Sequence, residues 1–410
     1  MEVLYKNCCG LDVHKNVIVA CILNGKNRFI SSFKAMTADI LDLVDWIKVN
    51  NCEAVAMEST GVYWKPIYNL LEAENIKTLV VNAKHMKAVP GRKTDVKDSE
   101  WIADLLKHGL LKASFIPSRD QRELRELVRY RKSIIEERSR EVTRIQKILE
   151  GANIKLSSVA SDVLGVSGRK MLEAIVDGVT DPKILASFAK SHLKKKLPEL
   201  ERALNGLIKD HQKKLLSIQL KHIDFLQEHL EEHIEAISNE IDTRLKEEQE
   251  IIELLDEIPG IGKRSAEYII SEIGTDMSIF PTANHLCSWA GLCPGNNESA
   301  GKQKSVRTRE GNKALRGTLV ECARSCVHCK DTYFFSQYSR ISVRRGKNKA
   351  AVAVAHSMLI IIYNMIKYKT HYKEMGADYF DKLNFESKIA RLKKKLESLG
   401  YSVSKQEIPA

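Results

Sequence analysis

The sequence has no uninterrupted apolar run long enough to cross a membrane. Its most apolar stretch, residues 350–366, contains His356, Ser357 and Asn364, whereas a spanning helix needs about 20 largely apolar residues. We therefore expect this stretch to be a buried helix. The first ten residues are mixed in character, unlike a secretory signal. Together these absences predict a cytoplasmic protein with no membrane partner.

The nine cysteines form no recognisable disulfide framework. They are scattered through a basic chain, which indicates a reducing compartment and free thiols. Cys322, Cys326 and Cys329 have the spacing of some iron–sulfur sites. However, they fall in a helical pattern, residues 314–328, in which steps of four and three mark one face. Buried free cysteines behave as small apolar residues, so we expect no metal at this cluster.

Basic residues outnumber acidic ones, and the excess is concentrated in one segment. The chain of 410 residues has a net charge of +12, which favours nucleic acids or acidic membrane surfaces as partners. Residues 302–349 hold 13 Lys and Arg against three acids, Glu310, Glu321 and Asp331. A solvated basic face explains most charged runs. The net positive charge of this one segment is nearly as large as that of the whole chain, which favours nucleic-acid contact instead.

Four acidic residues lie where a metal-dependent nuclease needs them. Asp12 ends an apolar run at residues 6–13, and Glu58 ends another after residues 53–57. Asp95 and Asp98 open a helical pattern, and their spacing of three places both on one helix face. Such carboxylates suit two Mg²⁺ (or Mn²⁺) ions about 4 Å apart, which together clamp a phosphodiester. Because the chain has 53 acids, the order of the surrounding elements must support this choice.

Periodicity predicts that order to be β-β-β-α-β-α-β-α. Asn24-Gly25 is a turn signal between the second and third strands, and Thr37 is the expected N-cap of the first helix. The expected elements are strands at 6–13, 16–23 and 28–33, a helix at 37–49, the strand ending at Glu58, a helix at 63–74, a strand at 78–81 and the helix of Asp95 and Asp98. This order resembles that of the RNase H-like (RuvC-like) fold. There the first and fourth strands are neighbours, which would bring Asp12 against Glu58.

A closer resemblance is to the DEDD-type insertion-sequence transposases (the IS one-ten type). The motifs that carry it are Gly10-Leu11-Asp12-Val13-His14-Lys15, Glu58-Ser59-Thr60-Gly61 and Lys93-Thr94-Asp95-Val96-Lys97-Asp98. The four acidic residues of that family fall on Asp12, Glu58, Asp95 and Asp98. The small residue that usually follows the last aspartate is Ser99 here, a minor departure.

Two long helices follow, at residues 119–150 and 210–255. Each has an apolar seam with steps of four and three, as in a heptad repeat, and two arginines interrupt the first seam. The helices are either an intramolecular antiparallel hairpin or a coiled-coil stalk that joins subunits. The sequence leaves both open, because buried seam positions look the same in each.

Residues 255–266 resemble a helix–hairpin–helix element. Gly260 and Gly262 would let the backbone approach a phosphate, and the N–H groups that open the second helix would face that anion. Lys263 and Arg264 add sequence-independent charge. The spacing excludes a P-loop, but a plain tight turn between two helices stays open.

Residues 258–367 resemble the C-terminal domain of the same transposase family. That resemblance implies a nucleophilic serine, which falls on Ser299 in the element Ser299-Ala300-Gly301. The second position is Ala here, where many relatives have Gly. Ser305 is the reserve candidate. A serine hydroxyl is a weak nucleophile and needs activation. Charge that builds on the phosphate oxygens would be met by basic side chains. The expected nucleic-acid contacts in this segment are Lys302, Lys304, Arg307, Arg309, Lys313 and Arg316.

The sequence therefore predicts an α/β plus all-α protein in four parts. These are an RNase H-like domain (1–115), a helical coiled-coil stalk (116–255), a C-terminal helical serine domain with the helix–hairpin–helix element (256–370) and a helical tail (371–410). The resemblance implies a bacterial or archaeal, nucleoid-associated DNA transposase that acts on donor and target DNA. It further implies a structured guide RNA and a homo-oligomer, dimer or tetramer, whose active sites combine the acids of one subunit with the serine of another. Two alternatives are a junction-resolvase-like metal nuclease without a covalent serine step and a non-catalytic nucleic-acid-binding relative.

Overall fold

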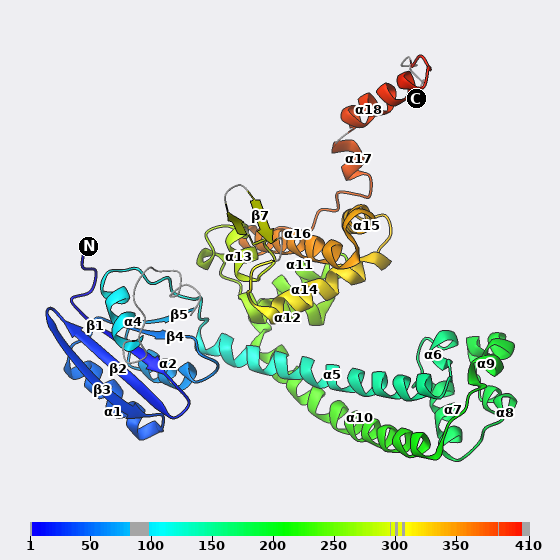
Figure 1. The fold of residues 1–410 in the computed structure, drawn as a ribbon, viewed down its shortest axis with the longest axis horizontal. Helices are drawn as coiled ribbons and strands as arrows, with labels where there is room; N and C mark the ends of the chain where they lie inside the picture. Colours follow the sequence, from blue (N-terminus) through cyan, green and yellow to red (C-terminus); the bar gives the residue numbers. More distant parts are fainter. Residues whose placement is uncertain are drawn as a thin grey trace. The chain divides into compact units, whose positions relative to one another are not determined.

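The structure is a computed structural model that describes residues 2–82, 98–295, 297–299, 302–305, 308–383 and 385–403. The chain divides into two compact units, Met1–Pro117 and Ser118–Ala410. The first unit is built on a β-sheet and the second is mostly helical (Figure 1). The chain is thus of mixed α/β type with a helical C-terminal part, as the sequence predicted. The finer division into four domains stays a prediction.

Five strands form the sheet of the first unit, in the order β3-β2-β1-β4-β5. The strands are β1 (Asn7–Val13), β2 (Val17–Asn24), β3 (Asn27–Lys34), β4 (Ala54–Glu58) and β5 (Thr78–Val81). β1, β2 and β3 form an antiparallel meander, while β4 pairs in parallel with β1 and with β5. The predicted adjacency of the first and fourth strands is therefore confirmed.

Alternate residues of β1 and β4 face opposite layers of helices, as the period of two in a strand requires. On one face Cys9, Leu11 and Met57 join the core under α1 (Thr37–Val49) and α2 (Trp64–Ala73). On the other face the small residues Cys8, Ala54 and Ala56 lie under α4 (Asp98–Lys107). The prediction that Thr37 is the N-cap of α1 is wrong: Met36 occupies that position without a side-chain cap, and Thr37 already has helical geometry.

Gly10 allows α4 to pack directly on the backbone of β1. A Cβ atom at this position would lie 2.2 Å from the carbonyl oxygen of Ser99 and 2.4 Å from the amide nitrogen of Ala103. Both neighbours are backbone atoms, so only a shift of the whole helix would relieve the clash. The close approach of α4 to the sheet therefore depends on the absence of a side chain here.

We expect Gly10→Ala to lower the free energy of unfolding of the first unit by about 2–3 kcal/mol, the usual cost of overpacking a rigid core. Urea denaturation followed by tryptophan fluorescence measures it, because Trp46, Trp64 and Trp101 all lie in this unit. Gly317→Ala is the control, since no atom lies within 4 Å of its added Cβ. An unchanged transition in Gly10→Ala would show that α4 adapts without cost.

The second unit begins with a long antiparallel helix hairpin of α5 (Arg119–Gly151) and α10 (Asp210–Arg244) (Figure 1). Their side chains pair in opposite directions along the two helices. Glu123 contacts Arg244 at 3.2 Å near one end, and Arg138 donates to Gln227 at 3.0 Å farther along. Of the two arrangements that the seams left open, this chain contains the intramolecular hairpin. The shorter helices α6 (Leu156–Val159), α7 (Val166–Val176), α8 (Pro182–Ser187) and α9 (Leu197–Leu204) connect its far ends.

The prediction of one continuous helix over residues 210–255 is wrong. α10 ends at Arg244, a 3₁₀ turn η3 follows at Lys246–Glu248, and α11 covers Gln249–Asp256. Leu245, which is buried, leaves helical geometry with φ −99° and ψ 16°. The turn redirects the chain so that Ile252 and Leu255 become buried against the rest of the unit. Local periodicity could not reveal this break, because it serves a tertiary contact.

The C-terminal helices pack around one apolar helix, α16 (Lys347–Tyr368). It contacts α13 (Ala283–Trp289), α14 (Lys313–Ser325) and α15 (Tyr333–Arg345). α16 is the one helix in the described parts of the chain that is long and apolar enough to cross a membrane by composition, but 56% of its most apolar window is buried inside the unit. It is therefore a core helix, as predicted. α17 (Tyr379–Leu383) and α18 (Phe385–Ser398) follow it.

The cysteine cluster lies in this core. Cys322 on α14 and Cys326 on the following 3₁₀ turn are buried free thiols, and burial raises the pKa of Cys326 to about 12. A protonated thiol is a poor metal ligand. The helix over 314–328 was predicted slightly too long, since α14 ends at Ser325 and Cys326–His328 is 3₁₀.

Candidate active site and nucleic-acid interface

Asp12 and Glu58 lie side by side at the carboxyl ends of two parallel strands. Leu11 of β1 pairs with Met57 of β4, so the next positions are Asp12 and Glu58, with backbones about 5 Å apart. Asp12 shares a face with Gly10, and Glu58 shares a face with Ala56, by the period of two. Both carboxylates therefore leave the sheet on the face that α4 covers.

The first residue of α4, Asp98, belongs to the same end of the sheet. α4 runs antiparallel to β1: the Leu4 N–H bonds to Lys107, the Cys8 thiol donates to the Ala103 carbonyl, and Gly10 touches Ser99. Asp98 directly precedes Ser99, so it lies toward the end of the sheet where β1 and β4 finish.

Both strand-end carboxylates have a polar partner two residues further along the chain. His14 Nε2 lies 3.1 Å from Asp12 Oδ2, and the Thr60 hydroxyl donates to Glu58 Oε1 at 3.2 Å. Asp12 keeps 19% of its side-chain surface exposed, so it is held but accessible. His14 and Thr60 both lie within the motifs recognised in the sequence, but the sequence alone assigned neither a role. The only local signal was the shared spacing of two residues.

The acidic residues provide hard oxygen donors, the chemistry that suits Mg²⁺ or Mn²⁺. Asp95, the fourth predicted ligand, lies outside the described residues. Within the described parts of the chain, no three His, Cys, Asp or Glu side chains form a group that could hold a metal ion. The backbones of Asp12 and Glu58 are neighbours at the ends of β1 and β4, and Asp98 begins the helix that packs on β1.

The predicted helix–hairpin–helix element is a tight turn between α11 and α12 (Lys263–Ile273). Gly260 has a positive φ of 92°, and a Cβ there would lie 2.6 Å from the carbonyl oxygen of Cys322. Packing against α14 therefore explains this glycine. Gly262 is exposed at the N-cap of α12, and the exposed Lys263 and Arg264 follow it. The turn thus presents an open helix N-terminus with two cations beside it.

Ser299 lies on a short antiparallel hairpin. β6 (Asn297–Ser299) pairs with β7 (Lys302–Ser305), and Ser299 is opposite Lys302. The side chains of Ser299, Lys302, Lys304 and Ser305 and the whole of Arg307 lie outside the described parts. Arg309 and Lys313 are exposed, and Arg316 is half-buried. The backbone of Ser299 and those of Lys302 and Lys304 therefore belong to one hairpin.

We call residues 290–311 the serine loop, and its two ends are joined at the base. The Asn312 N–H donates to the Trp289 carbonyl at 3.0 Å, and the Arg309 N–H donates to the Cys293 carbonyl at 3.2 Å. A Cβ on Gly311 would lie 2.3 Å from the amide nitrogen of Gly291, so the two strands of the base touch through backbone alone. The loop therefore leaves and re-enters the fold at one point.

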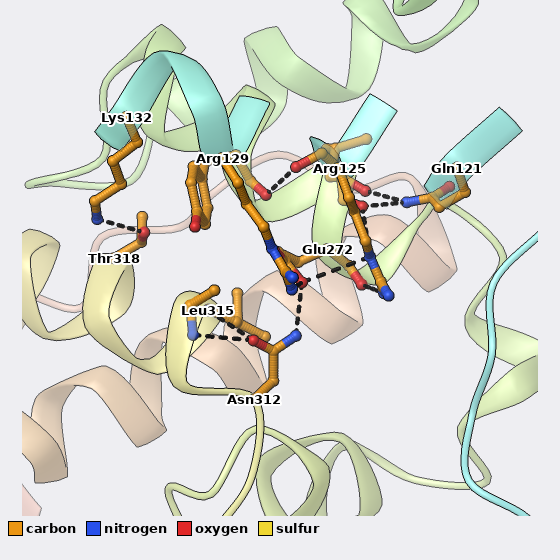
Figure 2. A network of polar contacts seen from close by, with 12 residues as sticks. Gln121, Arg125, Arg129, Lys132, Glu272, Asn312, Leu315 and Thr318 are labelled. Carbon is orange, nitrogen blue, oxygen red and sulfur yellow. Dashed lines mark hydrogen bonds and ion pairs between the residues drawn. The ribbon is translucent and has the colours of Figure 1, made fainter. Parts of the chain in front are cut away.

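A network of charged side chains around one buried carboxylate lies beneath that point (Figure 2). Its centre is Glu272, whose side chain on α12 has no exposed surface. Arg129 donates to both of its carboxylate oxygens, at 2.6 and 2.9 Å, and the amide nitrogen of Asn312 donates to Oε2 at 2.6 Å. Arg125 approaches the same carboxylate at 3.5 Å. One carboxylate thus joins α5, α12 and the base of the serine loop.

The same face of α5 also caps the carboxyl end of α12. Gln121 donates to the carbonyls of Ile270 and Ser271 at 2.8 and 2.7 Å, and Arg125 donates to Ser271 at 3.1 Å. Desolvation lowers the pKa of Arg125 to about 10, which still leaves it charged at neutral pH. Sequence reasoning missed this network entirely, because hydrogen-bonded partners in it lie up to 150 positions apart.

Two family profiles match the chain. Residues 9–154 match a DEDD transposase profile of the IS110 type, and residues 252–339 match the profile described as transposase IS116/IS110/IS902 family. The two segments together cover more than half of the chain.

Three curated relatives align with the chain. A pilin gene-inverting protein of Moraxella lacunata is 23% identical over 88% of this chain and 96% of its own length. The pilin gene-inverting protein of Moraxella bovis is 34% identical over 28% of this chain and 36% of its own length. An uncharacterized insertion element IS110 protein of Streptomyces coelicolor is 28% identical over 29% of this chain and 30% of its own length. The aligned part thus spans about a third of the length of the last two.

A sheet with acidic strand ends followed by a helical unit, each matching a transposase profile, defines the class of protein as a transposase. Transposases are enzymes that recombine DNA. The chain belongs to the IS116/IS110/IS902 family.

Proposed function

We propose that the protein cuts and rejoins the DNA of an insertion sequence with two kinds of catalytic group. Asp12, Glu58, Asp95 and Asp98 of the RNase H-like unit hold Mg²⁺ or Mn²⁺ beside the scissile phosphate. Ser299 of the serine loop is the nucleophile. The observation that carries the proposal is the parallel pairing of β1 with β4, which supports Asp12 and Glu58 as neighbours under the start of α4.

The serine step exchanges one ester bond of phosphorus for another. The bond between Ser299 Oγ and phosphorus forms while one phosphorus–oxygen bond of the DNA backbone breaks, and the leaving DNA oxygen gains the proton that the hydroxyl loses. The energy of the broken bond is kept in the serine ester, so rejoining needs no ATP. A bound divalent cation supplies charge stabilisation at the phosphate.

The basic side chains of the serine domain would position the DNA backbone rather than read bases. Arg309 and Lys313 are exposed on the returning side of the serine loop, and Lys263 and Arg264 flank the helix N-terminus at Gly262. Lys302, Lys304, Arg307 and Arg316 complete the proposed contacts. By family resemblance, a structured guide RNA would pair with donor and target DNA, and a second subunit would complete each active site.

Neutralising Arg309 or Lys313 tests the contact with phosphates. Each of Arg309→Gln and Lys313→Gln should reduce the slope of log affinity against log salt by about 0.9, the value for one released phosphate contact on duplex DNA. Fluorescence anisotropy at several salt concentrations measures this slope. Lys170→Gln, an exposed lysine on α7, is the control. Unchanged slopes in both variants would remove these residues from the interface.

The function itself is tested by trapping a covalent protein–DNA adduct. The full-length protein, Mg²⁺, element-end DNA and any co-purifying RNA are incubated, and the products are resolved under denaturing conditions. The proposal expects an adduct that protease removes. The alternative, a junction-resolvase-like nuclease that activates water, expects cut DNA without adduct.

RNA guidance and subunit number need separate measurements. Sequencing of RNA that co-purifies with the protein would reveal both a guide and the target it chooses, and the absence of one defined RNA species would refute guidance. Light scattering of the purified complex would distinguish a dimer or tetramer from a monomer.

A further inference from the structure

We propose that Glu272 is a positioning residue for the serine loop and acts on the reaction of Ser299 through Asn312. This inference rests on the proposed function, because it concerns the placement of the proposed nucleophile. Glu272 itself is buried on α12 and touches no solvent. Its effect must therefore pass through the groups that it binds.

The carboxylate of Glu272 is held in one orientation. The guanidinium of Arg129 donates to both carboxylate oxygens as a fork, and Arg125 lies 3.5 Å from Oε2. Arg125 is also held, by the carbonyls of Ser271 and Glu272 and by the ring of Trp289, whose centre is 5.8 Å from its guanidinium carbon. Bidentate charged pairs fix geometry as well as contribute energy. Asn312 thus meets an acceptor whose position is set by α5.

The identity of Asn312 is explained by this acceptor. Its side-chain oxygen caps α14 by accepting from the N–H groups of Ala314 and Leu315 at 3.0 and 3.1 Å. Serine, threonine or aspartate would cap the helix as well. The feature that only asparagine adds is an N–H donor, and that donor binds Glu272 at 2.6 Å. The planar amide therefore links the network to the first turn of α14 rigidly.

The link reaches the serine loop at both of its ends. The backbone N–H of Asn312 donates to the Trp289 carbonyl, where the loop begins, and Gly311 packs on Gly291 without an intervening side chain. Arg125 lies over the ring of the same Trp289. A tilt of Asn312 would therefore shift both ends of the serine loop together, and the hairpin of β6 and β7 with them.

Glu272 is fully buried, whereas Arg129 keeps 46% of its side-chain surface exposed. Burying a carboxylate costs desolvation energy that its ion pairs must first offset. A network centred on this buried carboxylate is thus poorly explained by stability alone. Its members meet at the one point where the serine loop is attached, which supports a role in orientation.

Exchanging the carboxylate of Glu272 and the amide of Asn312 tests the proposal. Asn312→Asp keeps a good N-cap but sets two carboxylates against each other. Glu272→Gln removes the charge at the centre. In the double variant, the amide of residue 272 can donate to the carboxylate at 312, so the link is restored with reversed polarity. A purely structural role would instead make the double variant at least as damaged as the two single ones.

The readout is hydrogen exchange of the β6 and β7 backbone amides in the full-length protein, measured together with the rate of adduct formation. We expect Asn312→Asp to accelerate the amide exchange and to slow adduct formation, each by about ten- to a hundredfold, the ratio that a hydrogen bond to a charged group corresponds to. The double variant should return to within about threefold of the native rates. If Asn312→Asp does not fold, Asn312→Ser replaces it. Serine keeps the cap but lacks the amide N–H that binds Glu272, and should accelerate exchange about tenfold.

Gln121→Leu is the matched control, since it removes two hydrogen bonds from the same network but none that reach the loop. It should lower the melting temperature and leave the exchange of β6 and β7 unchanged. Unchanged exchange in the Asn312 variants, or no recovery in the double variant, overturns the inference. The exchange measurement does not depend on chemistry at Ser299, so an absent adduct in the native protein would refute the proposed function separately.

Discussion

Ser299→Ala is expected to abolish both the covalent protein–DNA adduct and strand exchange. The serine oxygen is the atom that would become bonded to phosphorus, so no neighbouring group can replace it. Loss of a nucleophile in other serine enzymes lowers the rate by about 10⁴-fold or more. We expect the same here, with DNA binding retained because the exposed cations Arg309 and Lys313 are untouched. Denaturing gels of the trapped reaction and a binding titration measure the two effects.

Ser305→Ala is the control for this experiment, because Ser305 lies on β7 of the same hairpin and is the reserve candidate. It should leave the adduct in place. If Ser305→Ala removes the adduct and Ser299→Ala does not, the nucleophile is Ser305. If the native protein forms no adduct and Ser299→Ala still cuts DNA, water is the nucleophile and the junction-resolvase alternative holds.

Asp12→Asn and Glu58→Gln are each expected to lower DNA cutting by about 10³-fold. Each substitution removes a charge from the edge where β1 and β4 end, and metal ligation contributes several kcal/mol to stabilising a phosphoryl transition state. The hydrogen bonds from His14 and Thr60 would then fall on neutral amides. Chelation of divalent cations should have the same effect on the native protein, and added Mg²⁺ or Mn²⁺ should reverse it.

A second readout separates metal binding from catalysis. A cation that binds only the folded protein raises its melting temperature with concentration. We expect this rise in the native protein and its reduction in both variants. Asp42→Asn, an exposed acid on α1 of the same unit, should behave as the native protein does. A full Mg²⁺-dependent rise in Asp12→Asn would mean that this carboxylate is not a ligand.

Sequence patterns predicted the first unit well because its elements are local and regular. The strands that end near Asp12 and Glu58 alternate clearly, and the predicted bounds 37–49 and 78–81 coincide with those of α1 and β5. Adjacency of β1 and β4 came from resemblance to a known order of elements. The neighbours of the acids, His14 and Thr60, were visible in the motifs but had no assigned role until their contacts were seen.

The helical unit was predicted less completely, since its geometry depends on contacts between distant residues. A heptad seam does not reveal which helix covers it, and the antiparallel pairing of α5 with α10 became clear only from contacts such as Arg138 with Gln227. The break after Arg244 follows from the burial of Ile252 and Leu255. A glutamate in an apolar helix such as Glu272 resembles any solvated acid in the sequence, although it is completely buried.

The sequence by itself determined the order of the elements, the family motifs and the concentration of positive charge, because these depend on residues close together in the chain. Only the tertiary structure decided how closely α4 approaches Gly10 and which side chains hold the base of the serine loop. Close packing and ion pairs join distant segments; Arg129 and Glu272, for example, are 143 residues apart. Their partners are chosen by the fold, so no local pattern encodes them.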